Sequence, residues 1–172
     1  MLNLSDYIRD IKDFPKQGII FKDITTLLQD KNAFEHSMEL LYQHYKNEKI
    51  DKVVGIESRG FIGGAVLAYK LGAGFVPVRK KGKLPSDVLQ QEYQLEYGTS
   101  AVEIHVDSIA KGERVLIHDD VLATGGTAEA TCQLVEKLGG KIIGLSFIIE
   151  LSFLHPQKKN SHHNIFSLLQ YK

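Results

Sequence analysis

Residues 114–127 have the sequence Arg114-Val-Leu-Ile-His-Asp-Asp-Val-Leu-Ala-Thr-Gly-Gly-Thr127. The apolar run at 115–117 is typical of a buried parallel strand. Two adjacent carboxylates, Asp119 and Asp120, follow at the carboxyl end of this strand, and a loop of small residues then leads into a helical pattern. This order predicts a phosphate site, because the unpaired N–H groups and the positive end of the helix dipole both face an anion bound there.

The loop and the two acids suit different parts of one ligand. Gly125 and Gly126 allow the backbone to approach an anion closely, and the flanking threonines add hydroxyl donors. The carboxylates would repel a phosphate, so their natural partners are a metal ion or vicinal hydroxyls, as on a ribose. The stretch therefore favours a ribose 5-phosphate. The alternative is an ordinary surface turn between a strand and a helix, in which Asp, Thr and Gly are common.

The composition is that of an ordinary globular protein. With 172 residues, 43% of them hydrophobic, we expect one domain, 1–172, that buries roughly 70% of its unfolded surface. Lys plus Arg and Asp plus Glu both total 21, so no global basic field attracts nucleic acid or a membrane. The single cysteine, Cys132, fits a reducing cytosol. No stretch reaches the roughly 18 apolar residues of a membrane span, and the amino terminus lacks the basic region of a signal peptide, so we expect a cytoplasmic protein.

Strand patterns alternate with helical patterns along the chain. This alternation predicts an α/β fold, in which helices flank a parallel sheet on both faces and the functional residues lie at its carboxyl edge. We expect an amphipathic helix over 3–12, an extended stretch and a turn over 19–28, and a half-buried strand at 102–106. Residues 84–98 have no convincing periodicity and are expected to form a long loop. The expected long helix is 30–46, and the expected buried strands are 53–56, 74–78 and 142–149.

Cations follow two of the buried strands. Arg59 comes after strand 53–56, and four cations occur within residues 79–83, after strand 74–78. Such groups are often solvated, but at this edge they can neutralise an anionic ligand. Glu57 is expected to be the counter-charge of Arg59 or Arg79. A metal site made by the His162-His163 pair is not supported, because no further ligand has a suitable spacing.

Five segments, in order, resemble one family. Residues 115–127 resemble the phosphoribosyl-pyrophosphate motif of the type I phosphoribosyltransferases: a hydrophobic strand, two acids, small residues and Thr-Gly-Gly-Thr. Residues 14–25, Phe-Pro-Lys-Gln-Gly-Ile-Ile-Phe-Lys-Asp-Ile-Thr, look like a segment that the adenine phosphoribosyltransferases have and other phosphoribosyltransferases lack, although Gln17 stands where a second proline is usual. The other matches are Ser58-Arg-Gly-Phe61, Arg79-Lys-Lys-Gly-Lys-Leu-Pro85 and Leu95-Glu-Tyr-Gly98.

The resemblance implies how a purine would be held. A small amino-terminal segment, about 1–28 and here called the hood, would cover the base. Phe21 would stack on the ring, Leu151 would close its opposite face, and backbone groups around Ile20 and Lys22 would read the exocyclic amine and N1. A carbonyl acceptor there favours a 6-amino over a 6-oxo group, because the latter leaves a polar atom unpaired. Without the resemblance, Phe21 would be assigned to the core.

The resemblance also implies the reaction, in which adenine and 5-phosphoribosyl 1-pyrophosphate give AMP and pyrophosphate, a purine-salvage step. A flexible segment at about 80–98, here called the lid, would exclude water. Glu96 would be the catalytic acid near the base. Mg²⁺ would be held mainly by substrate and water. The family is usually homodimeric. The residues implied to bind the sugar diphosphate or AMP are Arg59, Arg79, Lys83, Tyr97, Asp119, Asp120, Ala123, Thr124, Gly125, Gly126 and Thr127.

Two other functions remain open at this point. One is a phosphoribosyltransferase for a 6-oxopurine, which the adenine-type segment 14–28 disfavours. The other is a non-enzymatic regulator that senses the sugar diphosphate and binds nucleic acid. Such a regulator would need a basic surface beyond residues 79–83 or an added DNA-binding module, and the chain has zero formal net charge.

Overall fold

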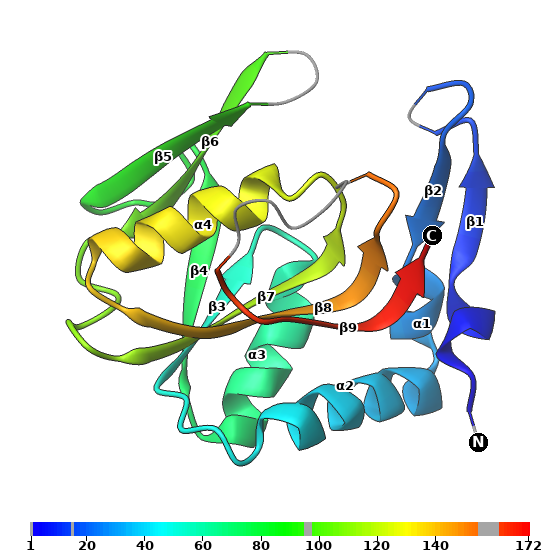
Figure 1. Ribbon diagram of the computed structural model, residues 1–172, viewed down its shortest axis with the longest axis horizontal. Coiled ribbons are helices and arrows are strands. Elements are labelled where there is room, and N and C mark those ends of the chain that lie inside the picture. The colour runs from blue at the N-terminus through cyan, green and yellow to red at the C-terminus, as the bar shows by residue number, and fades with distance from the viewer. Residues whose placement is uncertain (1, 15, 95–97, 155–161) are drawn as a thin grey trace.

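The computed structural model describes residues 2–14, 16–94, 98–154 and 162–172. A seven-stranded sheet with the order β5-β6-β4-β3-β7-β8-β9 forms the body of the protein (Figure 1). Its strands are β3 (Lys52–Ile56), β4 (Gly74–Lys80), β5 (Val88–Gln94), β6 (Thr99–His105), β7 (Arg114–Leu122), β8 (Lys141–Leu151) and β9 (Ile165–Tyr171). Five neighbouring strands, β4, β3, β7, β8 and β9, are parallel, whereas β6 and β5 are antiparallel and lie at one edge. The predicted α/β fold is confirmed.

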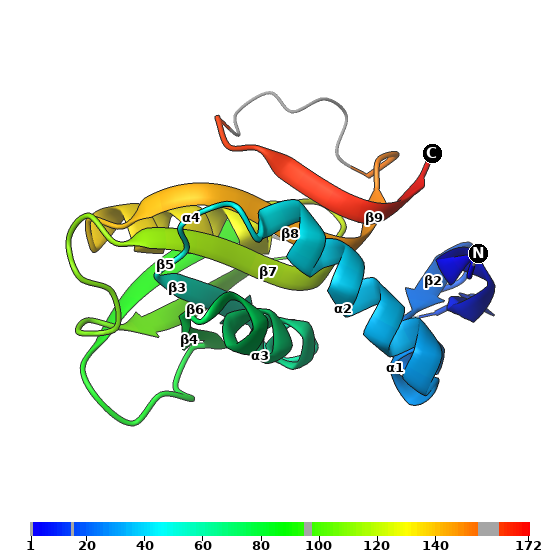
Figure 2. The ribbon, with the colours of Figure 1, turned by 90° about the horizontal axis from the view of Figure 1, so that it is seen from below.

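The helices cover both faces of the sheet. Residues of α2 (Lys31–Tyr45) and α3 (Gly60–Leu71) share one buried cluster with Leu116 of β7. Residues of α4 (Gly126–Lys137) share a second cluster with the adjacent Val115 and with Ile117. Because successive side chains of a strand point to opposite faces, β7 contributes to both cores. Figure 2 shows α2 running along the side of the molecule that carries α3.

The amino-terminal segment forms a separate small unit. It consists of a 3₁₀ turn (Leu4–Tyr7), the antiparallel pair β1 (Arg9–Lys12) and β2 (Ile20–Asp23), and α1 (Thr25–Gln29). In Figure 1 the β1–β2 pair stands beside the carboxyl edge of the main sheet. The predicted helix over 3–12 is wrong. Arg9 and Asp10 form ion pairs with Asp23 and Lys22 across the two strands, and this pairing outweighs the local helical spacing.

The expectation of a long loop over 84–98 is also partly wrong. Seven residues of it form β5, and each pairs with a residue of β6. Strand β5 has the mixed sequence Val-Leu-Gln-Gln-Glu-Tyr-Gln and no fully buried residue, so hydrophobic alternation could not reveal it. The partner strand departs from the expected half-buried pattern, because all four residues 101–104 are buried.

Candidate active site

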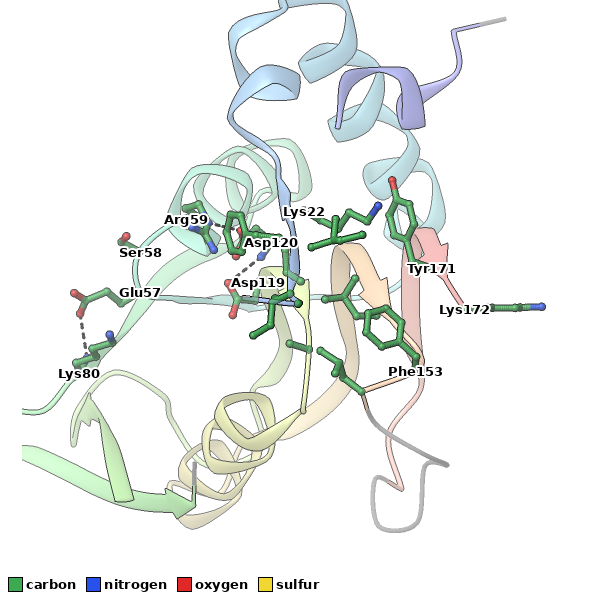
Figure 3. Close-up of a pocket in the computed structure, with 18 of the residues that line it drawn as sticks. Lys22, Glu57, Ser58, Arg59, Lys80, Asp119, Asp120, Phe153, Tyr171 and Lys172 are labelled. Carbon is green, nitrogen blue, oxygen red and sulfur yellow. Dashed lines mark hydrogen bonds and ion pairs between the residues drawn. The ribbon is translucent and has the colours of Figure 1, made fainter. Parts of the chain in front are cut away.

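A cavity of about 1050 Å³ lies at the carboxyl edge of the parallel strands (Figure 3). The hood forms one wall, and the ends of β7 and β8 with the turn after β3 form the other walls. This is the edge at which parallel sheets bind ligands, because each strand delivers its following loop there. Ten of the residues singled out from the sequence border the cavity: Ile20, Phe21, Lys22, Glu57, Arg59, Lys83, Asp119, Asp120, Ala123 and Leu151.

The two carboxylates lie within the last residues of β7, which continues to Leu122. Asp120 is buried, and its Oδ2 accepts a hydrogen bond from Arg59 Nε at 2.5 Å. Asp119 Oδ1 accepts from the backbone N–H of Asp120 at 2.8 Å. Burial, and next the neighbouring Asp120, raise the pKa of Asp119 well above its usual range. Both carboxyl groups border the cavity, and Asp120 lies beside the guanidinium of Arg59.

Glu57 holds the cations from residues 79–83. Its carboxylate accepts hydrogen bonds from Lys83 Nζ, from Arg79 Nε at 3.2 Å and from the backbone N–H of Lys80 at 3.0 Å. Burial alone would raise the pKa of Glu57, but these hydrogen bonds outweigh it and the net shift is downward. The prediction that Glu57 is the counter-charge of Arg79 is confirmed, whereas Arg59 pairs with Asp120 instead.

The glycine loop connects β7 to α4. Gly125 has φ +85° and ψ −7°, a left-handed conformation that strains other residues, and α4 begins at Gly126. Ala123 borders the cavity, whereas residues 124–127 do not. The end of β5 lies against this loop, since a side chain added at Gly126 would come within 3.3 Å of Tyr93 Cδ2 and 3.4 Å of the Gln94 carbonyl oxygen. The amino terminus of the twelve-residue helix α4 therefore lies three residues along the chain from Ala123, the last residue of this loop that borders the cavity.

Aromatic and aliphatic side chains form the other end of the cavity. Phe21 packs edge-on against Phe14, with 5.3 Å between ring centroids, and the Arg59 Cζ atom lies 5.5 Å from the Phe21 ring centroid. Ile20 is half-exposed on the same strand. Leu151, at the end of β8, borders the cavity from the main sheet. A flat apolar group between these walls would touch carbon on both sides.

Several residues that border the cavity were not singled out from the sequence. They include Ser58 and Lys80, beside predicted residues in the chain, and Phe153, Leu154, Tyr171 and Lys172. A sequence signal existed for Lys80, which belongs to the basic cluster. None existed for Tyr171, which reaches the cavity only because β9 pairs with β8. The predicted Glu96 and Tyr97 lie outside the described residues, and Arg79 contacts Glu57 without bordering the cavity.

Metal-binding clusters and membrane spans were also sought in the described part of the chain. It contains no group of three or more His, Cys, Asp or Glu side chains able to hold a metal ion. None of its helices is long and apolar enough to cross a membrane.

Comparison with known proteins gives matches along nearly the whole chain. Residues 23–167 match the phosphoribosyl transferase domain family. Proteins named adenine phosphoribosyltransferase from Geobacter metallireducens and Flavobacterium johnsoniae are 59% identical over 171 residues and 55% identical over 170 residues. Each alignment covers 99% of this chain and 100% of the relative.

Solved structures give the same result. The crystal structure of an adenine phosphoribosyltransferase from Rhodothermus marinus is 53% identical with a TM-score of 0.92, and the match covers 98% of this chain and 96% of that one. The Saccharomyces cerevisiae adenine phosphoribosyltransferase, complexed with an imino-altritol bisphosphate and adenine, is 39% identical with a TM-score of 0.89 and 96% coverage of both chains.

Proposed function

The chain belongs to the adenine phosphoribosyltransferase family, and from this premise we propose its function and the roles of its site residues. It is a pentosyltransferase that converts adenine and 5-phospho-α-D-ribose 1-diphosphate to AMP and diphosphate, a reaction of purine salvage. The observation that carries the proposal is a single cavity that joins the hood to the carboxylate pair after β7. Adenine would occupy the hood end, and the sugar diphosphate the end near the carboxylates.

In this proposal Asp119 and Asp120 accept hydrogen bonds from the two ribose hydroxyls. The loop 123–127 binds the 5-phosphate through its N–H groups, supported by the dipole of α4. When the bond between the anomeric carbon and diphosphate breaks ahead of bond formation to adenine, positive charge develops on the sugar. Carboxylates fixed beside that charge stabilise it, because they need not reorganise during the reaction.

Arg59, Arg79 and Lys83 are proposed to bind the diphosphate. All three cations already face a carboxylate, Asp120 or Glu57, which supports a partner exchange on binding. The diphosphate oxygens would replace the internal carboxylates as hydrogen-bond acceptors. Phe21 and Leu151 would sandwich the purine, and backbone groups around Ile20 and Lys22 would read its edge. The exposed position of Ile20 supports access to that backbone.

Mg²⁺ is proposed to enter with the sugar diphosphate. A substrate-borne ion fits the described residues, because they offer the oxygen donors Asp119 and Asp120 but no complete metal-binding group. When bound, Mg²⁺ would supply positive charge to the diphosphate as it leaves. Glu96 is proposed to meet the base as an acid and Tyr97 to lie near the phosphates. Both belong to the lid, whose strand β5 ends at Gln94 against the glycine loop.

We further propose that residues 1–172 act as one domain of a cytoplasmic homodimer with no nucleic-acid or membrane partner. The buried single cysteine, Cys132, supports a reducing compartment. An apolar face on α3 supports self-association. Ile62, Ala65 and Tyr69 follow each other at helical spacing on this face, and Tyr69 is 88% exposed. Phe75 of β4 adds to it beside Phe61, with 5.8 Å between their ring centroids.

The assay that tests the function measures AMP formation from adenine, the sugar diphosphate and Mg²⁺, with hypoxanthine and guanine in parallel. We expect product from adenine alone. Product from a 6-oxopurine instead would preserve the phosphate site and reject the base assignment. Measurable binding of the sugar diphosphate without turnover of any base would reject the enzyme in favour of a regulator.

A further inference from the structure

In the part of the chain that the structure describes, no strand of the hood pairs with a strand of the body. Strands β1 and β2 form their own two-stranded sheet, separate from the seven-stranded one. The chain enters the body through α1, which packs against α2. The distance between β2 and the opposite cavity wall therefore depends on side-chain contacts. This matters because β2 carries the backbone that is proposed to read the purine.

Lys22 makes such a contact with the last strand of the main sheet. Its Nζ lies 4.2 Å from the ring centroid of Tyr171, over the face of the ring. Asp10 holds the ammonium there through two hydrogen bonds to Nζ, of 2.7 and 2.9 Å. The Lys22 side chain is only 15% exposed, so solvent weakens the contact less than at an open surface. Figure 3 shows the Lys22 and Tyr171 side chains facing each other at one end of the cavity.

Tyr171 is held on a fixed strand beside the proposed purine wall. In the pairing of β8 with β9, Tyr171 lies opposite Leu151, and Gln170 lies opposite Glu150. The buried carboxylate of Glu150 accepts hydrogen bonds from Gln170 Nε2 at 3.0 Å and from Ser167 Oγ at 2.8 Å, both on β9. Burial raises the pKa of Tyr171, and Asp10 adds to the rise while Lys22 opposes it, so the ring is uncharged at neutral pH.

We propose that Lys22 and Tyr171 form a latch that fixes the hood across the base end of the cavity, which makes Tyr171 a positioning residue for purine binding. The inference rests on the proposed function, since it assigns the base to this end. The side chain of Lys22 would act on the hood while its backbone reads the base. The aromatic ring is what matters, because the attraction comes from the ring face and not from the hydroxyl.

The test compares Tyr171→Leu, Tyr171→Phe and Lys22→Met, with steady-state KM measured separately for adenine and for the sugar diphosphate. We expect Tyr171→Leu and Lys22→Met to raise KM for adenine by about three- to tenfold, the size of a cation–π contact, with KM for the sugar diphosphate unchanged. Tyr171→Phe keeps the ring and should restore the wild-type KM. Lys12→Met, an exposed lysine on the same hairpin, is the matched control and should resemble wild type.

The outcomes separate the latch from the function. A double variant of Lys22 and Tyr171 that is no worse than either single variant would support one shared contact. Equal rises in both KM values, or an effect in Tyr171→Phe as large as in Tyr171→Leu, would overturn the latch. An unchanged KM for adenine in both Tyr171→Leu and Lys22→Met would also overturn the latch, provided that thermal unfolding shows both variants to be folded. A wild-type protein inactive with adenine would reject the proposed function, and the latch with it.

Discussion

His118 lies inside the protein, directly before the carboxylate pair. Its ring is fully buried, its Nδ1 lies 3.2 Å from Ser146 Oγ, and its Nε2 has no hydrogen-bond partner among the residues that the structure describes. A side chain added at Gly63 would come within 2.4 Å of that Nε2, so α3 seals the ring. Burial lowers the pKa of His118 to about 4, although Asp120 and Ser146 oppose the shift.

This shift makes the free energy of unfolding depend on pH. The unfolded chain takes up a proton at His118 as the pH falls below about 6.5, whereas the folded chain does so only near 4. We therefore expect the full contribution of neutral His118 to the free energy of unfolding above pH 6.5. As the pH falls from 6.5 to 4, protonation of His118 in the unfolded chain should lower the free energy of unfolding by roughly 3 kcal/mol. Denaturant unfolding of wild type and His118→Gln across this range checks it. The difference in free energy of unfolding between wild type and His118→Gln should become smaller as the pH falls. A difference that stays constant with pH would contradict the lowered pKa of His118.

Between β7 and α4, the glycine loop requires one residue in a left-handed conformation. Gly125 has φ +85°, and Gly112, in the turn before β7, has φ +88°. Among the described residues, no atom comes closer than 3.9 Å to a Cβ added at either glycine, so we expect alanine to meet backbone strain and no steric clash at both positions. Gly125→Ala and Gly112→Ala should each lower the free energy of unfolding by about 1 kcal/mol. Only Gly125→Ala should raise KM for the sugar diphosphate, by roughly fivefold. An equal KM for the sugar diphosphate in the two variants would show that the glycine loop does not bind the 5-phosphate.

The elements that the sequence predicted well are those whose signal is local. Strand β7, the glycine loop and α4 each have an apolar run or a start signal within a few residues, and they were predicted in the right order. The elements predicted wrongly depend on distant partners. The 9–12 segment is a strand because of β2, and β5 is a strand because its backbone pairs with β6. Tyr171 was missed for the same reason, since only the sheet order brings the end of the chain to the cavity.

At the scale of the whole molecule, the proposed dimer depends on the exposed face of α3. Ile62 is 43% exposed and Tyr69 88% exposed, so a charge at Tyr69 costs little in a monomer but would be buried in a dimer that uses this face. Tyr69→Glu should therefore shift the protein from dimer to monomer in sedimentation velocity, with little change in thermal unfolding of the monomer. Val106→Glu, at a 46% exposed position after β6, is the matched control and should remain dimeric. If Tyr69→Glu remained dimeric, the dimer interface would have to lie on another surface, because burying an unpaired carboxylate in the interface is too costly.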